Sequence, residues 1–388
     1  MKVKQVAAML NTVINEVTGE SAVIAEDMSN IVDVGRTLTA SDTFENNFDN
    51  FVGKIIDKIG RTKIVDRTYR RTAPDILRDS WEYGSILEKV RVEVGDYLDN
   101  MAWSITDTQT FEDLFGAELP TVTAKYFNSK ATFSMKITIG KPQLVEAFKS
   151  AEAMMKFISA IENRVNFKMS LAVDKLTYMC LCNLIAEKIK SNNNVVNLLK
   201  IYNTKTGETL TSGKALTDRK FLAFCSATIR NYRKYLTGAS MLYNDDGYTT
   251  FTPEANQRLV MLSDFATAID TVLLAETFNE DFVKIGTYTS IPYWQGTGTT
   301  NEDRSKISVI PASEGPKPVG EDTRRTVTQT GIMAVLFDEE ACAICCENPV
   351  VESQRNAQKR ITNFFHSFDA QYMNDTGENC VVFIIADE

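Results

Sequence analysis

The sequence predicts a mixed α+β protein, because helical periodicity and strand alternation both recur along it. One stretch of nearly fifty residues, 142–190, carries apolar side chains at helical spacing and is too long for one typical globular helix. Two others, 89–94 and 131–140, alternate apolar and polar side chains, which is the pattern of half-exposed strands. The length of 388 residues is enough for more than one domain, and we find no internal repeat and no sharp linker.

The composition excludes several classes of protein. Hydrophobic residues make up 44% of the chain and charged residues 24%, which is average for a globular protein and unlike collagen, disulfide scaffolds or disordered chains. No apolar run approaches the roughly 20 residues of a transmembrane helix, and the N-terminus lacks the apolar region of a secretory signal. Seven cysteines, an odd number, indicate free thiols in a reducing compartment.

The single histidine, His366, excludes most histidine-based chemistry. Serine and cysteine hydrolases usually need a histidine base, and zinc or iron sites usually take two or more histidines. Three phenylalanines surround His366, so we interpret it as a structural residue. An enzyme that uses carboxylates or lysines stays open. The net charge of -9 argues against a broad nucleic-acid-binding face.

The N-terminal region predicts two amphipathic helices. In the first, apolar residues recur at spacings of three and four: Val6, Leu10, Val13 and Val17. In the second, the spacing is the same: Phe44, Phe48, Phe51, Ile55 and Ile59. Ser41 or Asp42 is a suitable N-cap for this second helix, and Gly60 a suitable stop.

Two strands follow, and together they predict an extended arm. In the first, valines lie on one face and charged residues on the other: Val90, Val92 and Val94 against Lys89, Arg91 and Glu93. The second is 131–140, and a polar connection, about 98–122, separates the two. Such a hairpin-like arm has little core of its own, so we expect it to need a partner surface.

The long helical stretch predicts a short helix followed by a long one. Pro142 suits the first helical turn, and SNNN after Lys190 ends the pattern. The long helix, from about 151 to 190, would be roughly 60 Å in length. We expect residues 191–220 to form a loop or small hairpin.

The remaining chain predicts alternating helices and strands. Helices are expected at 218–236 and 263–278. Strands are expected at 239–244, 283–290, 291–295, 306–313, 331–346, 359–374 and 379–387, the last of them buried. The stretch 296–325, rich in Gly, Pro, Thr and Ser, predicts a surface loop.

Three motifs could carry chemistry, and each has a structural explanation that we favour. Cys342 and Cys345 form a CxxC beside Cys346, yet they lie in an apolar stretch, and the other close pair, Cys180 and Cys182, lies on the long helix. We interpret all of them as structural thiols. The run GTGTTN at 296–301 lacks the lysine end of a phosphate loop. The acidic patches 245–246 and 338–340 lack the spacing of a calcium loop and predict solvated turns.

One basic stretch stays open between two interpretations. Its positive residues are Arg61, Lys63, Arg67, Arg70, Arg71 and Arg78. They could contact nucleic-acid phosphates or form salt bridges with a neighbouring subunit, and the acidic excess of the chain favours the second. Trp81 and Tyr83, just beyond, could anchor a partner or form the base of the arm.

The order of these elements resembles a tailed-phage major capsid protein of the Hong Kong 97 type, and more narrowly those of phi 29-like podoviruses. Four stretches carry the resemblance: FVGKIIDKIGRTKIVDRTYRR, LPTVTAKYFNSKATFSMKITI, PQLVEAFKSAEAMMKFISAIENRV and ATAIDTVLLAETFNEDFVKIGTYTSIPYWQG. It covers nearly the whole chain as a pattern of elements rather than as a short fingerprint.

The resemblance implies an architecture of named parts. They are an N-arm (1–50), the entry to a peripheral domain (51–80), an E-loop (81–140), the peripheral domain with its spine helix (141–235), an axial domain (236–335) and a return through the peripheral domain (336–388). The N-arm and the E-loop strands, about 81–97 and 124–139, would carry inter-subunit contacts. The residues expected at these contacts are Arg67, Arg70, Arg71, Trp81, Tyr83, Lys89, Arg91, Glu93, Tyr126 and Phe127.

The implied function is structural. The subunit would assemble into pentamers and hexamers of a virion head around double-stranded DNA in the host cytoplasm, with a scaffolding protein and a portal as partners. No cofactor, metal, membrane or catalytic residue is expected. The phi 29 protein carries a further immunoglobulin-like C-terminal domain that we do not find before Glu388. The lysine–asparagine cross-link of the Hong Kong 97 phage protein is not assigned to any residues.

Two alternatives remain at this point. An encapsulin-like compartment shell would share the architecture, and a cargo enzyme encoded next door, rather than terminase and portal, would identify it. A cytoplasmic enzyme based on carboxylates or cysteines would instead need a pocket that contains Cys342, Cys345 and His366 together.

Overall fold

The computed structural model describes most of the chain outside the predicted arm tip and its approaches. The described residues are 3–18, 24–40, 54, 74, 76, 87–93, 120–127, 130–276, 285–295, 304–315, 324–356, 358 and 361–387. The predicted helix at 44–59, apart from Lys54, therefore lies outside them, as does residue 94. So do the basic residues 61–71 and 78, the aromatic residues 81 and 83, and the run 296–301.

The structure contains both helices and strands, as the sequence predicts, and the described helices come first. They are α1 (Val3–Thr18), α2 (Ile31–Ala40), α4 (Lys141–Ala147), α5 (Ala151–Ser191), α6 (Leu198–Thr206), α7 (Ser212–Ala215), α8 (Arg219–Tyr235) and α9 (Ser263–Glu276). Two 3₁₀ turns, Glu254–Asn256 and Ala312–Glu314, lie in the connections.

The described strands form four sheets. The strands are β1 (Leu87–Glu93), β2 (Thr121–Phe127), β3 (Lys130–Gly140), β4 (Val195–Asn197), β5 (Gln257–Leu262), β6 (Thr289–Ile291), β7 (Ile307–Val309), β8 (Val327–Gln329), β9 (Ile332–Asp338), β10 (Cys342–Asn356), β11 (Ile361–Asn374) and β12 (Cys380–Ile384). Their orders are β1-β2, β10-β11-β3, β4-β12-β9-β5-β6 and β7-β8.

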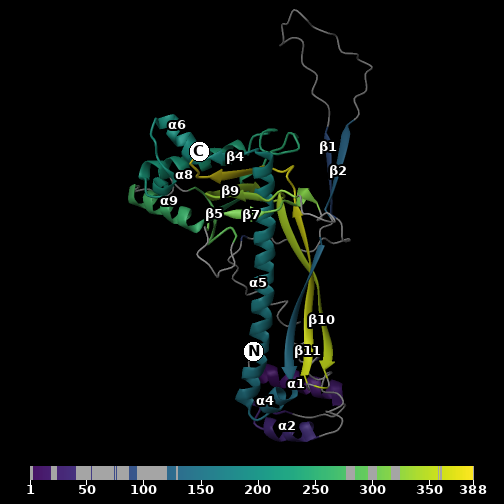
Figure 1. The fold of residues 1–388 in the computed structure, drawn as a ribbon. Helices are drawn as coiled ribbons and strands as arrows, with labels where there is room; N and C mark the ends of the chain where they lie inside the picture. The colour runs from purple at the N-terminus through teal and green to yellow at the C-terminus, as the bar shows by residue number, and fades with distance from the viewer. Residues whose placement is uncertain are drawn as a thin grey trace, which may run out of the picture.

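Helix α5 is the longest described element, and the other described elements lie at its two ends or alongside it (Figure 1). Its 41 residues confirm the predicted long helix and extend about 60 Å. The Ser150 hydroxyl caps the first turn by accepting a hydrogen bond from the Ala153 amide, and Asn192 ends the helix in the left-handed conformation. The five-stranded sheet with α6, α8 and α9 lies at one end of α5, and α1, α2 and α4 lie at the other (Figure 1). The long strands β3, β10 and β11 run alongside it.

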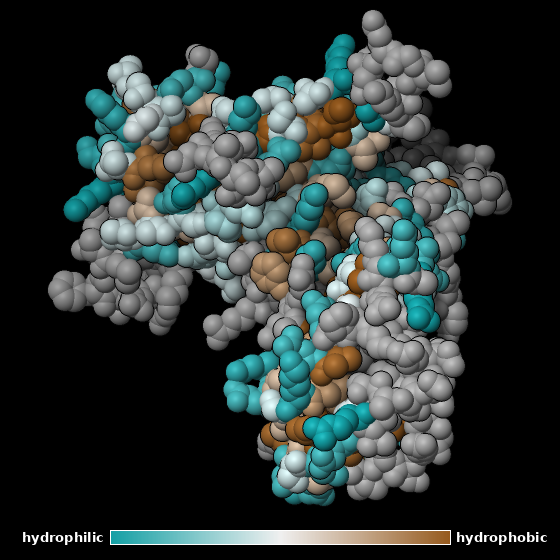
Figure 2. Space-filling view, turned by 60° about the horizontal axis from the view of Figure 1, so that its bottom comes forward, coloured by the Kyte–Doolittle hydropathy of each residue, from teal (hydrophilic) through white to brown (hydrophobic). Residues whose placement is uncertain are grey.

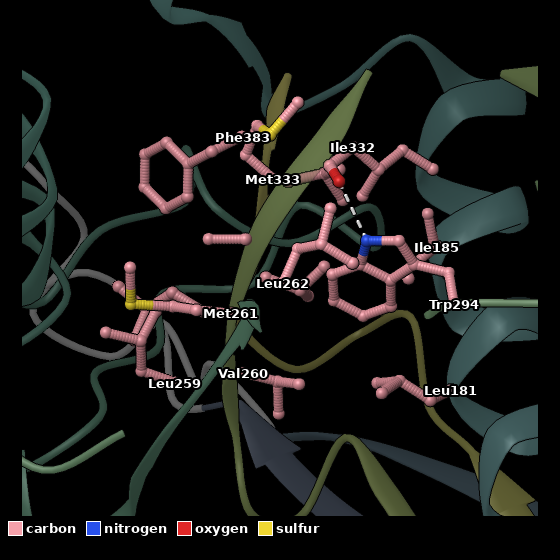
Figure 3. Close-up of a cluster of buried hydrophobic side chains, with 14 of the residues drawn as sticks. Leu181, Ile185, Leu259, Val260, Met261, Leu262, Trp294, Ile332, Met333 and Phe383 are labelled. Carbon is pink, nitrogen blue, oxygen red and sulfur yellow. Dashed lines mark hydrogen bonds between the residues drawn. The ribbon is translucent and has the colours of Figure 1, made fainter. Parts of the chain in front are cut away.

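The larger core lies between α5 and the five-stranded sheet. Leu181 and Ile185 of α5 face the fully buried Trp294, whose indole N–H donates to the Ile332 carbonyl at 2.8 Å (Figure 3). This bond satisfies the one polar atom of an otherwise apolar side chain. Strands β9 and β12 are buried along their whole length, which confirms the predicted buried final strand.

A second, smaller core closes the opposite end of α5. Three residues of the apolar stripe that the sequence predicts in α1, Val6, Leu10 and Val13, are buried here against this chain's own β3, α5 and Phe364 of β11. Asn11 fixes the chain after α1, because its amide donates to the Ile24 carbonyl at 2.9 Å and its carbonyl accepts from the Ile24 amide. The N-terminal helices therefore use their apolar stripes within the subunit.

The arm differs from the predicted one in its strand pairing. Strand β1 pairs with β2, whereas β3, the second strand that we expected in the arm, pairs with β11 and joins the long sheet. Alternation of apolar and polar residues identifies strands but carries no information about which strands pair. The expected arm strand 124–139 thus spans parts of β2 and β3.

Two local predictions were also wrong. Residues 198–206 form helix α6 rather than a loop, with Asn197 accepting from the amides of Leu199 and Lys200 as its cap. Residues 239–244 form no strand and contribute only one bridge, Ser240 to Thr250. In addition, the sequence analysis assigned no element to the short apolar run that forms strand β5.

Packing between α2 and α4 leads to a prediction about Gly35. A Cβ at this position would lie 2.6 Å from the Cβ of Phe148, closer than packed carbon atoms approach. We expect Gly35→Ala to lower the free energy of unfolding by about 1–3 kcal/mol, measured by urea denaturation. The control is Gly213→Ala in α7, where nothing lies within 4 Å and the change is expected to be neutral or slightly stabilising. Equal effects of the two substitutions would contradict this packing.

Candidate assembly surface

The β1–β2 arm has two chemically different faces. In its register, Glu88 lies opposite Tyr126, Val90 opposite Ala124 and Val92 opposite Val122. Residues opposite one another in an antiparallel pair share a face, so these six side chains lie on one side of the arm. Lys89, Arg91 and Lys125 lie on the other side.

The valine face of the arm is open to solvent. The exposed fractions are 55% for Val90, 57% for Val92, 61% for Val122 and 64% for Tyr126. The Tyr126 hydroxyl donates to the Glu88 carboxylate at 3.0 Å, across the strand pair. This is an apolar strip with one polar edge, and nothing in the described part of the chain covers it.

The basic face of the arm is bound to the same chain. Lys89 donates from Nζ to the Asp375 carboxylate at 3.0 Å, to Glu378 at 3.0 Å and to the Glu340 carbonyl at 3.1 Å. Asp375 and Glu378 lie in the turn between β11 and β12. The first strand of the arm is therefore anchored by one ammonium group with three acceptors.

The second strand of the arm reaches the same turn. Lys125 donates to the other carboxylate oxygen of Asp375 at 2.9 Å and also pairs with Asp246. Arg91 pairs with Glu378 at 2.5 Å and lies over the ring of Tyr248, 5.4 Å from its centroid. Both strands thus contact the 375–378 turn and the 246–248 loop.

Asp375 is the centre of this anchor. Its side chain is 1% exposed and accepts from both lysines. Burial alone would raise the pKa of Asp375, but Lys89 and Lys125 together outweigh burial and lower it. The Gly377 amide also donates to Asp375 at 3.0 Å. A side chain at Gly377 would meet the ends of the Asp246 and Lys125 side chains, which would have to shift.

The anchor continues into α5 through Lys188. This fully buried lysine donates to the Thr376 carbonyl at 3.1 Å and pairs with Asp245 at 3.1 Å. The arm, helix α5 and two loops therefore meet in one polar network. Asp245 and Asp246, which the sequence predicted as a solvated acidic turn, are instead the partners of two lysines.

The structure places only part of the predicted contact set. Lys89 and Arg91 bind within their own chain, and Glu93 pairs with Thr121 in the strand ladder. Tyr126 is exposed and Phe127 is half-buried. Arg67, Arg70, Arg71, Trp81 and Tyr83 lie outside the described residues, so their contacts stay a prediction. Lys125, Asp375 and Glu378 were missed, because nothing local in the sequence connects a β-turn with an arm 250 residues away.

Other apolar side chains are exposed in separate patches. They include Phe167 and Leu171 on α5 and Met241, Leu242 and Phe251 around the 240–250 bridge. Apolar groups also lie between hydrophilic ones on the face of the molecule that comes forward in Figure 2. Several exposed patches on one chain are typical of a subunit that contacts more than one neighbour.

Comparison with known proteins identifies the kind of subunit. Residues 6–384 match the family described as Phi29-like phage major capsid protein. The chain belongs to this family. No curated protein sequence matches this capsid protein. It is located in the virion capsid, where multiple subunits build the shell, and the family supports this function over the compartment-shell and enzyme alternatives.

Chains in solved structures of phage particles have a fold similar to that of this chain. A chain in the capsid structure of Staphylococcus phage Andhra is 9% identical, with a TM-score of 0.52, covering 81% of this chain and 84% of that one. A chain in the structure of head fiber and inner core protein gp22 of native bacteriophage P68 is 10% identical, with a TM-score of 0.54, covering 80% and 83%. At these identities the likeness concerns the fold.

The residues that could have carried chemistry have structural positions in this capsid protein. His366 lies in the central strand of the long sheet, between Val351 and Met135, and is almost fully buried. Cys342 and Cys345 are buried in β10. Within the described ranges, no group of three or more potential metal ligands comes together.

One segment of α5 has the length and composition of a membrane span. This segment, Phe167–Ser191, is half buried in the fold, and the core helix of a protein passes the same test. Its apolar residues Leu181 and Ile185 contact Trp294 and the five-stranded sheet. Burial in the larger core therefore accounts for the apolar character of the segment.

The anchor leads to a prediction about Asp375. Asp375→Asn removes the negative charge with which both Lys89 and Lys125 pair. We expect it to lower the free energy of local opening of the arm by about 1.5–3 kcal/mol. Hydrogen exchange of the amides in 87–93 and 121–127 should accelerate at least about tenfold. Asp369→Asn, which removes a more exposed pair with Lys130, is the control and should leave the arm unchanged.

The same anchor predicts a pH dependence. Because the pKa of Asp375 is lowered from its ordinary 3.8, the folded state favours the carboxylate, so the anchor is complete above that value and is lost as the pH falls through the lowered pKa. The protection factors of the arm amides in the wild type, which are corrected for the intrinsic pH dependence of exchange, should therefore stay constant down to about pH 4 and fall below it. A loss of protection near neutral pH would contradict this assignment.

His366 predicts a second pH effect with a different range. Burial lowers the pKa of His366 from its ordinary 6.5, so below that value the unfolded chain binds the proton more readily. The free energy of unfolding should fall as the pH drops below 6.5, by at most about 1.4 kcal/mol per pH unit. His366→Gln should remove this component, and equal slopes in urea titrations of both proteins would exclude it.

Proposed function

We propose that this major capsid protein builds its shell through the valine face of the β1–β2 arm, which a neighbouring subunit covers. The supporting observation is that the face is open while the opposite, charged face is bound to the subunit's own turns. A polar face would ordinarily be solvated and an apolar face buried. A further surface that covers the valine face would bury its apolar area, and a repeated copy of the chain supplies such a surface at every position of a shell.

The finer architecture is part of the same proposal. It is the Hong Kong 97-type division into N-arm, E-loop, spine helix, axial and peripheral domains at the boundaries given above. In it, α5 is the spine helix and the β1–β2 pair is the base of the E-loop. The subunits assemble as pentamers and hexamers, because head-to-tail contacts close into rings.

The partners follow from the resemblance to phi 29-like proteins. They are a scaffolding protein and a portal, and the shell encloses double-stranded DNA after assembly in the host cytoplasm. An overall charge of -9 suits a container that encloses DNA without sequence-specific binding. For the basic stretch 61–78, we favour contact with a neighbouring subunit, with DNA contact as the alternative. No catalytic role is proposed for any residue.

A substitution on the valine face tests the proposal. Val92 is exposed in the single subunit, so Val92→Asp should leave the thermal midpoint of the free subunit within about 1 °C, because surface changes are usually close to neutral. In an assembly reaction, the same charge would be buried without a partner, and the yield of shells should fall at least tenfold. Val92→Thr is the matched control and should retain assembly.

Electron microscopy of the expressed protein, with and without a scaffolding protein, provides the readout. Closed shells from wild type and Val92→Thr, with free subunits from Val92→Asp, are expected. Undiminished shells from Val92→Asp would contradict the role of the arm face. Monodisperse monomers from the wild type under all conditions would contradict self-assembly itself.

A further inference from the structure

One cysteine from each of the two close pairs of the sequence meets the other in the larger core. Cys180 lies on α5 and Cys342 begins β10, 162 residues later, and their sulfur atoms are 3.3 Å apart. Both side chains are buried, with exposed fractions of 2% and 1%. All seven cysteines of the chain are free thiols in this structure.

Asn374 holds these two cysteines together. It lies opposite Cys342 in the β10–β11 ladder. Its side-chain amide donates to the Cys180 carbonyl at 3.1 Å, and the Cys180 thiol donates to its side-chain carbonyl at 3.1 Å. The spine helix and the long sheet are thus connected at one point, where the Cys342 thiol donates to the Cys180 sulfur.

We propose that Cys180 and Cys342 are an oxidation site that forms a disulfide between the spine helix and strand β10. The inference rests on the proposed function in one respect: a virion leaves the reducing cytoplasm for an oxidising environment. In the reaction, both S–H bonds break and one S–S bond forms. The two electrons and two protons pass to a peroxide, which is reduced to two molecules of water.

The geometry supports this pair over the other cysteines. A disulfide has a sulfur–sulfur length of about 2.05 Å, so each sulfur needs to move by about 0.6 Å, within the reach of small side-chain rotations. The Cys182 thiol instead donates to the Trp294 carbonyl at 3.1 Å. The hydrogen bond to Cys180, together with burial, raises the pKa of the Cys342 thiol, so oxidation should take hours rather than minutes.

The consequence of this bond would be a more persistent shell subunit. The cross-link closes a loop of about 160 residues, and long loops give the largest restriction of the unfolded chain. It also connects α5 to the β10–β11 pair, whose following turn anchors the arm. Oxidation would thus increase stability after assembly without changing the outer surface of the subunit.

Peptide mapping of the oxidised protein tests the proposal directly. Free subunits and assembled shells are incubated with a small molar excess of hydrogen peroxide for a day, then denatured, alkylated and digested. We expect a peptide pair cross-linked through Cys180 and Cys342, five alkylated cysteines in place of seven, and a thermal midpoint raised by roughly 5 °C. Dithiothreitol should reverse all three.

Variants separate this pair from general thiol oxidation. Cys342→Ala should abolish the cross-link and the shift in midpoint, whereas Cys225→Ala, at another buried cysteine on α8, should retain both. If Cys342→Ala does not fold, the peptide map of the oxidised wild-type protein still shows whether Cys180 and Cys342 are cross-linked. Seven unmodified thiols, or a different pair, would overturn the proposal. Shells that form but still lack the cross-link after the peroxide treatment would refute only this inference, and failure to form shells would refute only the proposed function.

Discussion

The position of the arm depends on one buried carboxylate. Asp375 accepts from Lys89 on one arm strand and Lys125 on the other, and it lies in a turn that also contacts Lys188 of helix α5. Burial of a carboxylate costs desolvation free energy unless the group is paired and hydrogen-bonded. Here two lysines, rather than one, offset that desolvation. Because the basic face is held inward, the valine face has to point outward. The surface that we propose for contact with a neighbouring subunit is thus a consequence of electrostatics within one chain.

Helix α5 has a second structural role, because it connects two hydrophobic cores. The larger core forms around Trp294 and the five-stranded sheet, and the smaller one forms where the N-terminal helices cover the other end. A helix of 41 residues cannot be covered along its whole length by one compact layer. Its middle remains partly exposed, with Phe167 and Leu171 at the surface. An elongated subunit of this kind has more surface for neighbours than a compact one of equal mass.

Much of the fold could be predicted because its elements have strong local patterns. The stripe of α1, the caps of α5 and α8 and the alternation in β11 all follow from neighbouring residues. The assembly surface was predicted only in part. The sequence located the arm at 89–94 and named Lys89, Arg91 and Tyr126, but it expected β3 as the second arm strand. It also connected the charged residues with a neighbouring subunit, whereas the structure pairs Lys89 and Arg91 with Glu378 of the same chain.

The amino-acid sequence by itself determined the α+β class, the long helix, the two-faced strand and the scarcity of histidine, since the chain has only one. Only the tertiary structure decided which strands pair, which face of the arm is open and that Cys180 lies against Cys342. The physical reason is the range of the interactions. Periodicity and capping act over a few residues, whereas Lys89 and Asp375 are 286 residues apart, and their contact depends on how every intervening element packs.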